Sequence, residues 1–301
     1  MKLAMIGLGK MGVFMSERLM KGGHEIVAFD LSQQAVESLA AKGAEASTSL
    51  VDAISKLPSP KIAWVMLPEG APTHDTIVEL SKLFTSGDVI IDGGNTNYED
   101  HMATAAEITP SGVHLLDAGT SGGVWGLTEG YCLMVGGEAS AVSAVEPIFT
   151  CLAPPGGYAH VGPIGAGHFV KMVHNGIEYG LMQAYAEGFE IMAAAKEFNL
   201  DLHEISAIWR YGSVVRSWLL ELTELALADS EGFAKIEGIV TDTGEGRWTV
   251  EEAVRRAVPA PVITTALYAR FASRDPNSLS NRLVSAMRHQ FGGHAVVTGG
   301  S

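Results

Sequence analysis

The sequence predicts an α/β protein with an N-terminal Rossmann-type, doubly wound, mostly parallel sheet and an all-helical C-terminal domain. Three observations predict it. Short β-rich apolar runs alternate with helix-like stretches through residues 1–162, a glycine-rich turn follows the first run, and helical patterns fill residues 163–301. We therefore expect two domains, at residues 1–162 and 163–301.

Each predicted strand is a short apolar run that ends in turn residues. Five runs have helix-like segments between them, which is typical of βαβ units: "KLAMIGLG", "HEIVAFD", "KIAWVML", "DVIIDGG" and "GVHLLDAG". A further pair, "YCLMVGG" and "GYAHVG", flanks a helical stretch at residues 139–150. Beyond Pro163, residues 165–198 predict one unusually long helix.

The first motif is a glycine-rich turn between the first predicted strand and the first predicted helix. Glycines permit a tight turn and let the backbone approach a pyrophosphate, which the helix N-terminus attracts. The alternative is a glycine turn without a ligand, but the strand and helix on either side favour a dinucleotide site. Its residues are Gly7, Leu8, Gly9, Lys10, Met11 and Gly12.

The second predicted strand ends at Asp30, followed by Leu31 and Ser32. An acidic side chain here accepts hydrogen bonds from the adenosine ribose hydroxyls and repels a 2′-phosphate. We therefore expect NAD as the cofactor, with NADP disfavoured. A turn or helix-capping aspartate is the alternative interpretation of Asp30.

Three loops at predicted strand ends carry small and hydrogen-bonding residues where a ligand crevice is expected. Asn95 can orient a nicotinamide or a substrate carboxylate, and Ser121 offers a hydroxyl beside flexible backbone N–H groups. Ordinary turn chemistry is the alternative for each loop. The loop residues in question are Leu67, Pro68, Glu69, Asn95, Ser121, Gly122 and Gly123.

Composition narrows the class of protein. The chain has 301 residues, 47% of them hydrophobic, and a net charge of −14, which argues against nucleic acid as a partner. Its start resembles neither a secretory signal nor a membrane span, so we expect a cytoplasmic protein without a membrane partner. Cys132 and Cys151 are too few for a disulfide framework, and no Cys/His spacing predicts a metal site.

Polar residues share one face of the long predicted helix. Lys171, His174, Asn175 and Glu178 lie on the same arc, whereas stabilising ion pairs are three or four residues apart rather than seven. Two turns separate the Cα atoms of Lys171 and Glu178 by roughly 10.5 Å, a distance that suits a base and an acid acting on opposite ends of a small substrate. A solvated surface stripe is the alternative.

Together these residues resemble the 6-phosphogluconate dehydrogenases, in their short-chain form, within the β-hydroxyacid dehydrogenase superfamily. The resemblance runs from residue 6 to residue 294. Most specific are "HNGIEYG" and "DTGEGRW"; the other shared motifs are "IGLGKMG", "DGGN", "GTSGGVWGLTEGYCLMVGG", "GAGHFVKMVHNGIEYG" and "RHQFGGH".

The resemblance implies a reaction and its residues. It implies oxidation and decarboxylation of 6-phosphogluconate to ribulose 5-phosphate and CO₂, as in the pentose phosphate pathway and gluconate utilisation. Lys171 would take the proton of the C3 hydroxyl, for which removal from water must favour its neutral form. Glu178 would protonate the enol left by decarboxylation, and His174 and Asn175 would hold substrate hydroxyls. No metal is required, because protonated Lys171 can polarise the enolate oxygen.

Two departures from the long form of the family matter. Asp30-Leu31-Ser32 stands where that form has Asn-Arg-Thr, which suits NADP, so the resemblance agrees with NAD. Thr243 stands where the long form has a phosphate-binding lysine, so phosphate must be held by other residues.

The resemblance also implies a shared active site. Arg288 and His294 match an arginine and a histidine that bind the substrate phosphate from the neighbouring subunit, and Tyr179 and Arg270 would complete the pocket. We therefore expect a homo-oligomer, a dimer or tetramer.

Two other functions stay open. A non-decarboxylating β-hydroxyacid dehydrogenase of the 3-hydroxyisobutyrate type would share the glycine turn and Lys171 but would not need Glu178 or a phosphate pocket. A non-catalytic dinucleotide sensor is disfavoured by the presence of Lys171, Asn175 and Glu178 together.

Overall fold

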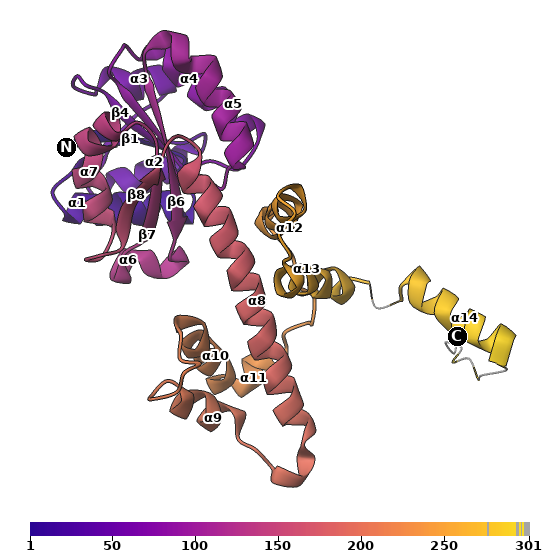
Figure 1. Cartoon of the computed structure of the whole chain (residues 1–301). Helices are drawn as coiled ribbons and strands as arrows, with labels where there is room; N and C mark the ends of the chain where they lie inside the picture. Colours follow the sequence, from indigo (N-terminus) through magenta and orange to yellow (C-terminus); the bar gives the residue numbers. More distant parts are fainter. Residues whose placement is uncertain (276, 293–294, 296, 298–301) are drawn as a thin grey trace. The chain divides into compact units, whose positions relative to one another are not determined.

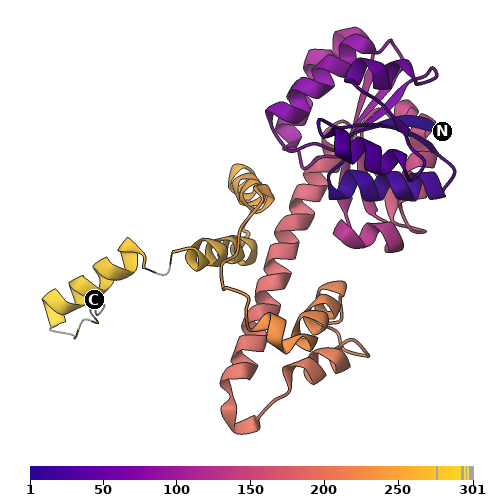
Figure 2. The same ribbon diagram turned by 180° about the vertical axis from the view of Figure 1, so that it is seen from behind.

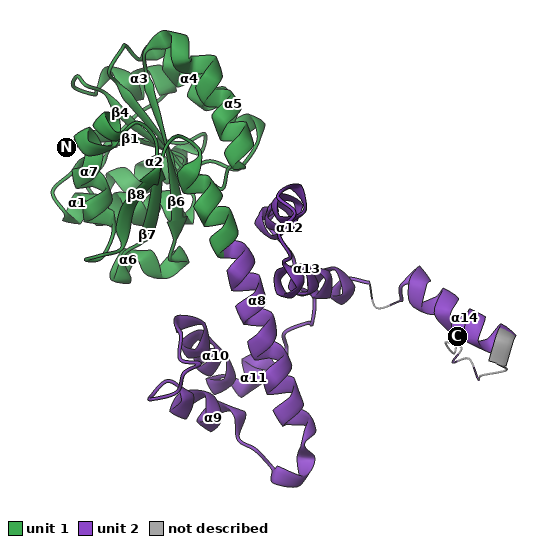
Figure 3. Ribbon diagram, in the orientation of Figure 1, with its two compact units in different colours: residues 1–174 green, residues 175–301 purple. Residues whose placement is uncertain are grey.

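The computed structural model describes residues 1–275, 277–292, 295 and 297, and its contacts divide the chain into two compact units (Figure 3). The first unit comprises residues 1–174 and the second comprises residues 175–301. The domain boundary expected between residues 162 and 163 stays a prediction.

The first unit is built on one eight-stranded sheet with strand order β3-β2-β1-β4-β5-β6-β7-β8 (Figure 1). Neighbouring strands run parallel except β6 and β7, which are antiparallel. The predicted, mostly parallel sheet is therefore confirmed. The strands are β1 (Lys2–Ile6), β2 (Glu25–Phe29), β3 (Glu45–Ala46), β4 (Ile62–Val65), β5 (Val89–Asp92), β6 (His114–Ser121), β7 (Cys132–Gly136) and β8 (Tyr158–Gly162).

Helices cover both faces of this sheet, as Figures 1 and 2 show. Side chains of α1, α2 and α7 form one apolar core with the sheet, and side chains of α3, α4 and α5 form a second core on the other face. The alternation of β1 explains the two cores, since Leu3 and Met5 enter one and Ala4 and Ile6 enter the other. The helices are α1 (Lys10–Lys21), α2 (Gln33–Ala40), α3 (Leu50–Ser55), α4 (Ala71–Leu83), α5 (Tyr98–Ile108), α6 (Gly126–Glu129) and α7 (Ala139–Leu152).

The long helix α8 runs without interruption from Ala166 to Ala194, so the predicted long helix is confirmed, with a short 3₁₀ turn at Lys196–Phe198. The second unit contains the later part of α8 and further helices, and its described residues are helical or irregular, as expected. These helices are α9 (Leu202–Trp209), α10 (Trp218–Ala228), α11 (Ser230–Phe233), α12 (Glu245–Arg255), α13 (Pro261–Ser273) and α14 (Leu279–Gly292). In the described part of the chain, no helix combines the length and apolarity needed to cross a membrane.

Two glycines of α8 explain part of the "HNGIEYG" motif. A Cβ at Gly176 would lie 2.5 Å from Thr249 of α12, and a Cβ at Gly180 would lie 3.1 Å from Val262 of α13. Both contacts lie within the second unit. Glycine at these positions lets α12 and α13 approach the backbone of α8 closely.

Candidate active site

The glycine turn joins β1 to α1 in a conformation that requires its glycines. Gly7 has φ +97°, and a Cβ there would lie 2.4 Å from the carbonyl oxygen of Met66. A Cβ at Gly12 would lie 2.0 Å from the carbonyl oxygen of Gly7. Gly9, the N-cap of α1, has open space around it and offers no side chain to the first N–H groups of the helix. The turn therefore leaves room for an anion at the helix N-terminus, which fits a dinucleotide pyrophosphate.

Asp30 follows the last residue of β2 and connects two loops. One carboxylate oxygen accepts the Leu8 N–H at 2.6 Å, and the other accepts the Ser32 N–H at 2.7 Å. The Ser32 hydroxyl in turn accepts the Ala35 N–H and caps α2, while Leu31 is 97% exposed. The carboxylate thus lies beside the glycine turn, which is the position expected of the predicted ribose-binding group.

The other strand-end loops lie at the carboxyl edge of the same sheet. Leu67, Pro68 and Glu69 follow β4, and burial, with a smaller contribution from the negative charge of Asp100, raises the pKa of Glu69 above its usual value. Asn95 is half-buried in the loop after β5. Ser121 is the last residue of β6, and the turn that follows uses Gly122 and Gly123, which have φ +130° and +51°.

The polar face of α8 is partly buried along its length. The side chains of Lys171, His174, Asn175 and Glu178 are all neither buried nor exposed, and Tyr179 is 6% exposed. A face that simply met water would be exposed at several of these positions. The partial burial therefore favours a face with neighbouring groups over a fully solvated stripe.

Lys171 is held close to the sheet. A Cβ at Gly119 of β6 would lie 2.6 Å from the Lys171 Cβ and 2.6 Å from the Gly167 carbonyl oxygen. A Cβ at Gly167 would lie 2.4 Å from the Met134 carbonyl oxygen. The two glycines let the first turns of α8 lie directly on β6, so the stem of Lys171 begins at the sheet.

In the second unit the structure brings Tyr179 and Arg270 together, with the guanidinium 3.4 Å from the centre of the ring. The Tyr179 hydroxyl accepts the Thr243 N–H at 3.4 Å, so Thr243 lies in the same cluster. Arg270 also donates to the Thr241 carbonyl at 3.1 Å. Tyr179 and Arg270, which are expected at the phosphate pocket, and Thr243, which stands at the position of the family's lysine, are therefore neighbours.

Two more arginines lie beside this cluster through Asp242. Arg247 and Arg274 approach its carboxylate at 2.6 and 2.7 Å, and the Asp242 side chain is 3% exposed. The hydrogen bond from Arg247 holds the pKa of Asp242 below its ordinary value, and Arg274 adds to this against the opposing effect of burial.

Arg288 lies on α14 and is exposed, whereas His294 lies outside the described residues.

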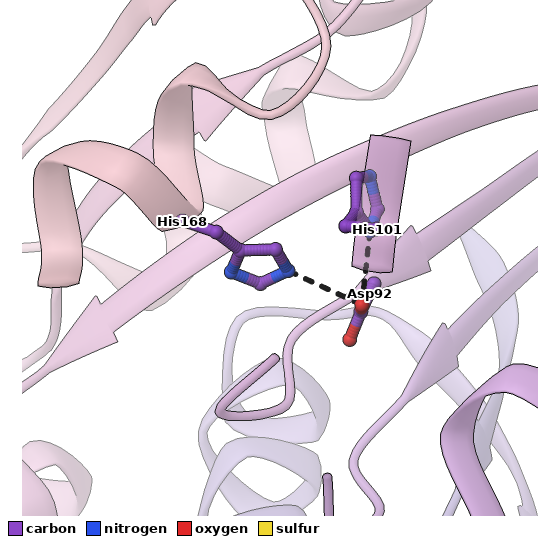
Figure 4. Close-up of side chains that lie close together, drawn as sticks. All are labelled: Asp92, His101 and His168. Carbon is purple, nitrogen blue, oxygen red and sulfur yellow. Dashed lines mark hydrogen bonds and ion pairs between the residues drawn. The ribbon is translucent and has the colours of Figure 1, made fainter. Parts of the chain in front are cut away.

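A buried cluster in the first unit was not predicted. His101 Nδ1 donates to Asp92 Oδ2 at 3.0 Å, and His168 Nε2 lies 3.2 Å from the same oxygen (Figure 4). Burial raises the pKa of Asp92, but the positive charge of His168 and the hydrogen bonds from both rings outweigh it and hold the pKa well below 3.8. These three residues place metal-ligating atoms within 4.8 Å of one another, a grouping that the sequence spacing did not indicate.

Comparison with known proteins gives the family. The NAD binding domain of 6-phosphogluconate dehydrogenase matches residues 2–162, and the 6-phosphogluconate dehydrogenase C-terminal domain matches residues 167–278. The chain belongs to the 6-phosphogluconate dehydrogenase family. It is therefore an oxidoreductase with an N-terminal NAD-binding domain, as the resemblance implied.

Two relatives match this 6-phosphogluconate dehydrogenase family member over nearly their whole length. The NAD(+)-dependent, decarboxylating 6-phosphogluconate dehydrogenase of Haloferax volcanii is 42% identical over 98% of each chain. YqeC of Bacillus subtilis, provisionally named a 6-phosphogluconate dehydrogenase, is 43% identical over 98% of this chain and 99% of its own. The NAD(+)-dependent, decarboxylating enzyme of Bacillus subtilis is 34% identical, and the match spans 61% of its length.

Solved structures show the same fold. The Plasmodium falciparum 6-phosphogluconate dehydrogenase has a TM-score of 0.85 at 28% identity over 99% of this chain and 66% of its own. The 3-hydroxyisobutyrate dehydrogenase of Mycobacterium tuberculosis has a TM-score of 0.73 at 24% identity over 90% of this chain and 94% of its own. The latter likeness is one of fold alone.

Proposed function

We propose that this enzyme oxidises 6-phosphogluconate at C3 with NAD and releases CO₂, giving ribulose 5-phosphate and NADH, a step of the pentose phosphate pathway and of gluconate utilisation. The observation that carries the proposal is the uninterrupted helix α8, which has Lys171 and Glu178 on one partly buried face. The matches to both family domains and the name of the Haloferax volcanii relative support the substrate.

The residues of the first unit fit a dinucleotide. The N-terminus of α1 and the glycine turn would hold the pyrophosphate, Asp30 would bind the adenosine ribose, and the loops at Leu67–Glu69 and Asn95 would border the nicotinamide. When bound, NAD supplies the hydride acceptor. The negative charge of Asp30 favours NAD over NADP because it would lie close to a 2′-phosphate.

Lys171 is the proposed base for the C3 hydroxyl. The close approach of α8 to the sheet at Gly119 and Gly167 supports this role, because it holds the stem of Lys171 beside β6, one of the strands that carry the strand-end loops. After oxidation the same lysine, now protonated, stabilises negative charge on the C3 oxygen as CO₂ leaves. Glu178 then gives a proton to C1 of the enediol, roughly 10.5 Å of helix rise from the base. His174 and Asn175 hold substrate hydroxyls between them.

The phosphate is the proposed ligand of Tyr179 and Arg270, with Arg288 and His294 given by a neighbouring subunit. Ser121, Gly122 and Gly123 would offer hydrogen-bond donors to the substrate carboxylate. The second unit exposes many large apolar side chains, which supports a homo-oligomer. Examples are Ile177, Leu181, Ile191, Ile208, Leu225, Val254, Val262 and Leu283.

The decisive experiment follows NADH and CO₂ together, with purified enzyme, NAD and 6-phosphogluconate. We expect both products in equal amounts, a near-complete loss of NADH formation in Lys171→Ala, and a larger defect in CO₂ release than in oxidation in Glu178→Ala. NADH without CO₂ would favour the 3-hydroxyisobutyrate type, and neither product would favour a non-catalytic role.

Asp30→Asn tests the cofactor proposal more sharply than Asp30→Ala. Asparagine keeps one oxygen for the Leu8 or Ser32 N–H but loses the charge that opposes a 2′-phosphate. We expect the ratio of kcat/KM for NADP to that for NAD to rise. An unchanged ratio would place the discrimination in other residues.

The shared site is tested by mixing two variants that are each nearly inactive. Lys171→Ala subunits and Arg288→Ala subunits should regain activity in hybrid oligomers, because one site in each hybrid then has both residues intact. A lack of recovery despite demonstrated subunit exchange would mean that each chain completes its own site.

A further inference from the structure

Two buried aspartates lie side by side at the carboxyl edge of the sheet in the first unit. Asp92 is the last residue of β5 and pairs in register with Asp117 of β6, and both side chains are fully buried. Buried carboxylates are costly unless hydrogen bonds and positive charge compensate them. The groups that make hydrogen bonds and ion pairs with the two aspartates are therefore held in fixed positions.

The compensation comes from two histidines on different helices. His101 of α5 and His168 of α8 both point to Asp92, as Figure 4 shows, and their rings meet edge to face with centres 4.9 Å apart. His101 Nε2 also lies 3.7 Å from Asp117 Oδ1. Both carboxylates therefore have an imidazole nitrogen within ion-pair distance.

Backbone groups extend the cluster in two directions. Asp117 accepts the Gly165 N–H at 2.8 Å and the His168 N–H at 2.9 Å, so it holds the N-terminus of α8. Asp92 accepts the Gly94 N–H at 3.0 Å, so it holds the loop that carries Asn95. The cluster thus attaches the Asn95 loop and the first turn of α8 to the same pair of buried carboxylates.

Lys171 lies one turn beyond His168 on α8. Its stem begins at the close contact between Gly119 and Gly167, and the His168 ring attaches the preceding turn to Asp92. A misplacement of about 1 Å in a reacting group can cost about 100-fold in rate. A rigid attachment of this turn is therefore valuable for a base that must meet both substrate and nicotinamide.

We propose that Asp92, His101, Asp117 and His168 form a positioning cluster that fixes Lys171 relative to the Asn95 loop. The proposal rests on the proposed function, because it assigns the cluster a role through Lys171. None of the four residues is a catalytic residue. The hydrogen bonds and ion pairs among them account for the convergence of the three metal-ligating atoms without a cation.

The test compares His168→Gln with His114→Gln in the full-length enzyme. His114 is the matched control, because it also pairs with a carboxylate, Glu138 at 3.1 Å, but lies at the opposite end of β6. In His168→Gln we expect kcat with 6-phosphogluconate to fall roughly 10–100-fold, the Kd for NAD to stay unchanged, and the primary isotope effect with C3-deuterated substrate to increase. His114→Gln should keep the wild-type values. If His168→Gln fails to fold, Asp92→Asn, which keeps the side-chain shape, takes its place.

Hydrogen exchange gives a second readout that needs no turnover. Amides of residues 93–97 and 166–174 should exchange faster together in His168→Gln but not in His114→Gln. Wild-type kcat in His168→Gln with only a lower melting temperature would show a purely structural cluster and overturn the proposal. The proposal would also be overturned if the wild type contained one equivalent of a transition metal and His168→Gln did not. A wild type that does not oxidise 6-phosphogluconate would instead refute the proposed function. In that case, faster exchange of residues 93–97 and 166–174 together in His168→Gln would still show whether the cluster joins these two segments.

Discussion

Each unit of the molecule contains a carboxylate that contacts two basic side chains, Asp92 in the first and Asp242 in the second, but the surroundings differ. Asp92 receives His101 and His168 in the first unit, and none of the three side chains is more than 2% exposed. Asp242 receives Arg247 and Arg274 in the second unit, where the arginine side chains are 48% and 32% exposed. Both carboxylates are buried, so when a carboxylate is lost, water can solvate the two arginines of the second cluster but not the two histidines of the first. Burial, rather than the number of ion pairs, should therefore decide what each carboxylate contributes.

Replacing each carboxylate by alanine should give the largest difference in stability between the two clusters. Asp92→Ala leaves two buried histidines without their acceptor, and we expect it to lower the free energy of unfolding by about 3–5 kcal/mol. Asp242→Ala leaves two arginines that can turn toward water, and we expect less than half of that loss. Urea unfolding followed by circular dichroism measures both. Equal losses would show that burial does not distinguish the clusters.

Acid should reveal a smaller difference. The pKa of each carboxyl is lowered in the folded state, so each contributes stability that is complete well above pH 3.8 and is lost as the pH falls through that value toward the folded pKa. The stability advantage of the wild type over Asp92→Asn should therefore shrink between pH 5 and pH 3. We expect a weaker trend for Asp242→Asn. An advantage over Asp92→Asn that grows toward pH 3 would contradict the lowered pKa of Asp92.

The smallest expected effect is that of salt. Exposed charges are screened by ions, with a Debye length of about 10 Å at 0.1 M, whereas buried charges are screened much less. The stability difference between wild type and Asp242→Asn should fall between 0.02 and 0.5 M NaCl, and the difference for Asp92→Asn should change less. The melting temperature of the three proteins across this range is the measurement. Equal salt dependence would place both clusters in contact with solvent.

The comparison also shows what the sequence could predict. Apolar runs and turn residues located the strands of the sheet except β3, which has only two residues, Glu45 and Ala46, and so has no recognisable alternation. Helical periodicity located α8 and placed Lys171 and Glu178 on one of its faces. Such local patterns are visible because they depend on neighbours three or four positions away.

The buried cluster could not be predicted in the same way. Asp92 and His168 both stand inside motifs that the sequence singled out, "DGGN" and "GAGHFVK", but their contact joins two distant segments. His101 gave no signal of its own, because one histidine in an otherwise ordinary helix is equally compatible with an exposed position. Contacts of this kind depend on strand order and helix docking, which the composition of a single segment does not contain.

The hydrogen bonds of Asp117 have a consequence for biosynthesis. As the chain leaves the ribosome, both aspartates and every strand of the sheet are made before Gly165 and His168, which supply the amides and the imidazole that compensate the two carboxylates. Until then the carboxyl edge of the sheet holds two acids with one histidine between them. Vectorial folding of the nucleotide-binding part should therefore pause until the first turns of α8 leave the ribosome, and a nascent chain halted before this point should be sensitive to protease where one halted after it is not.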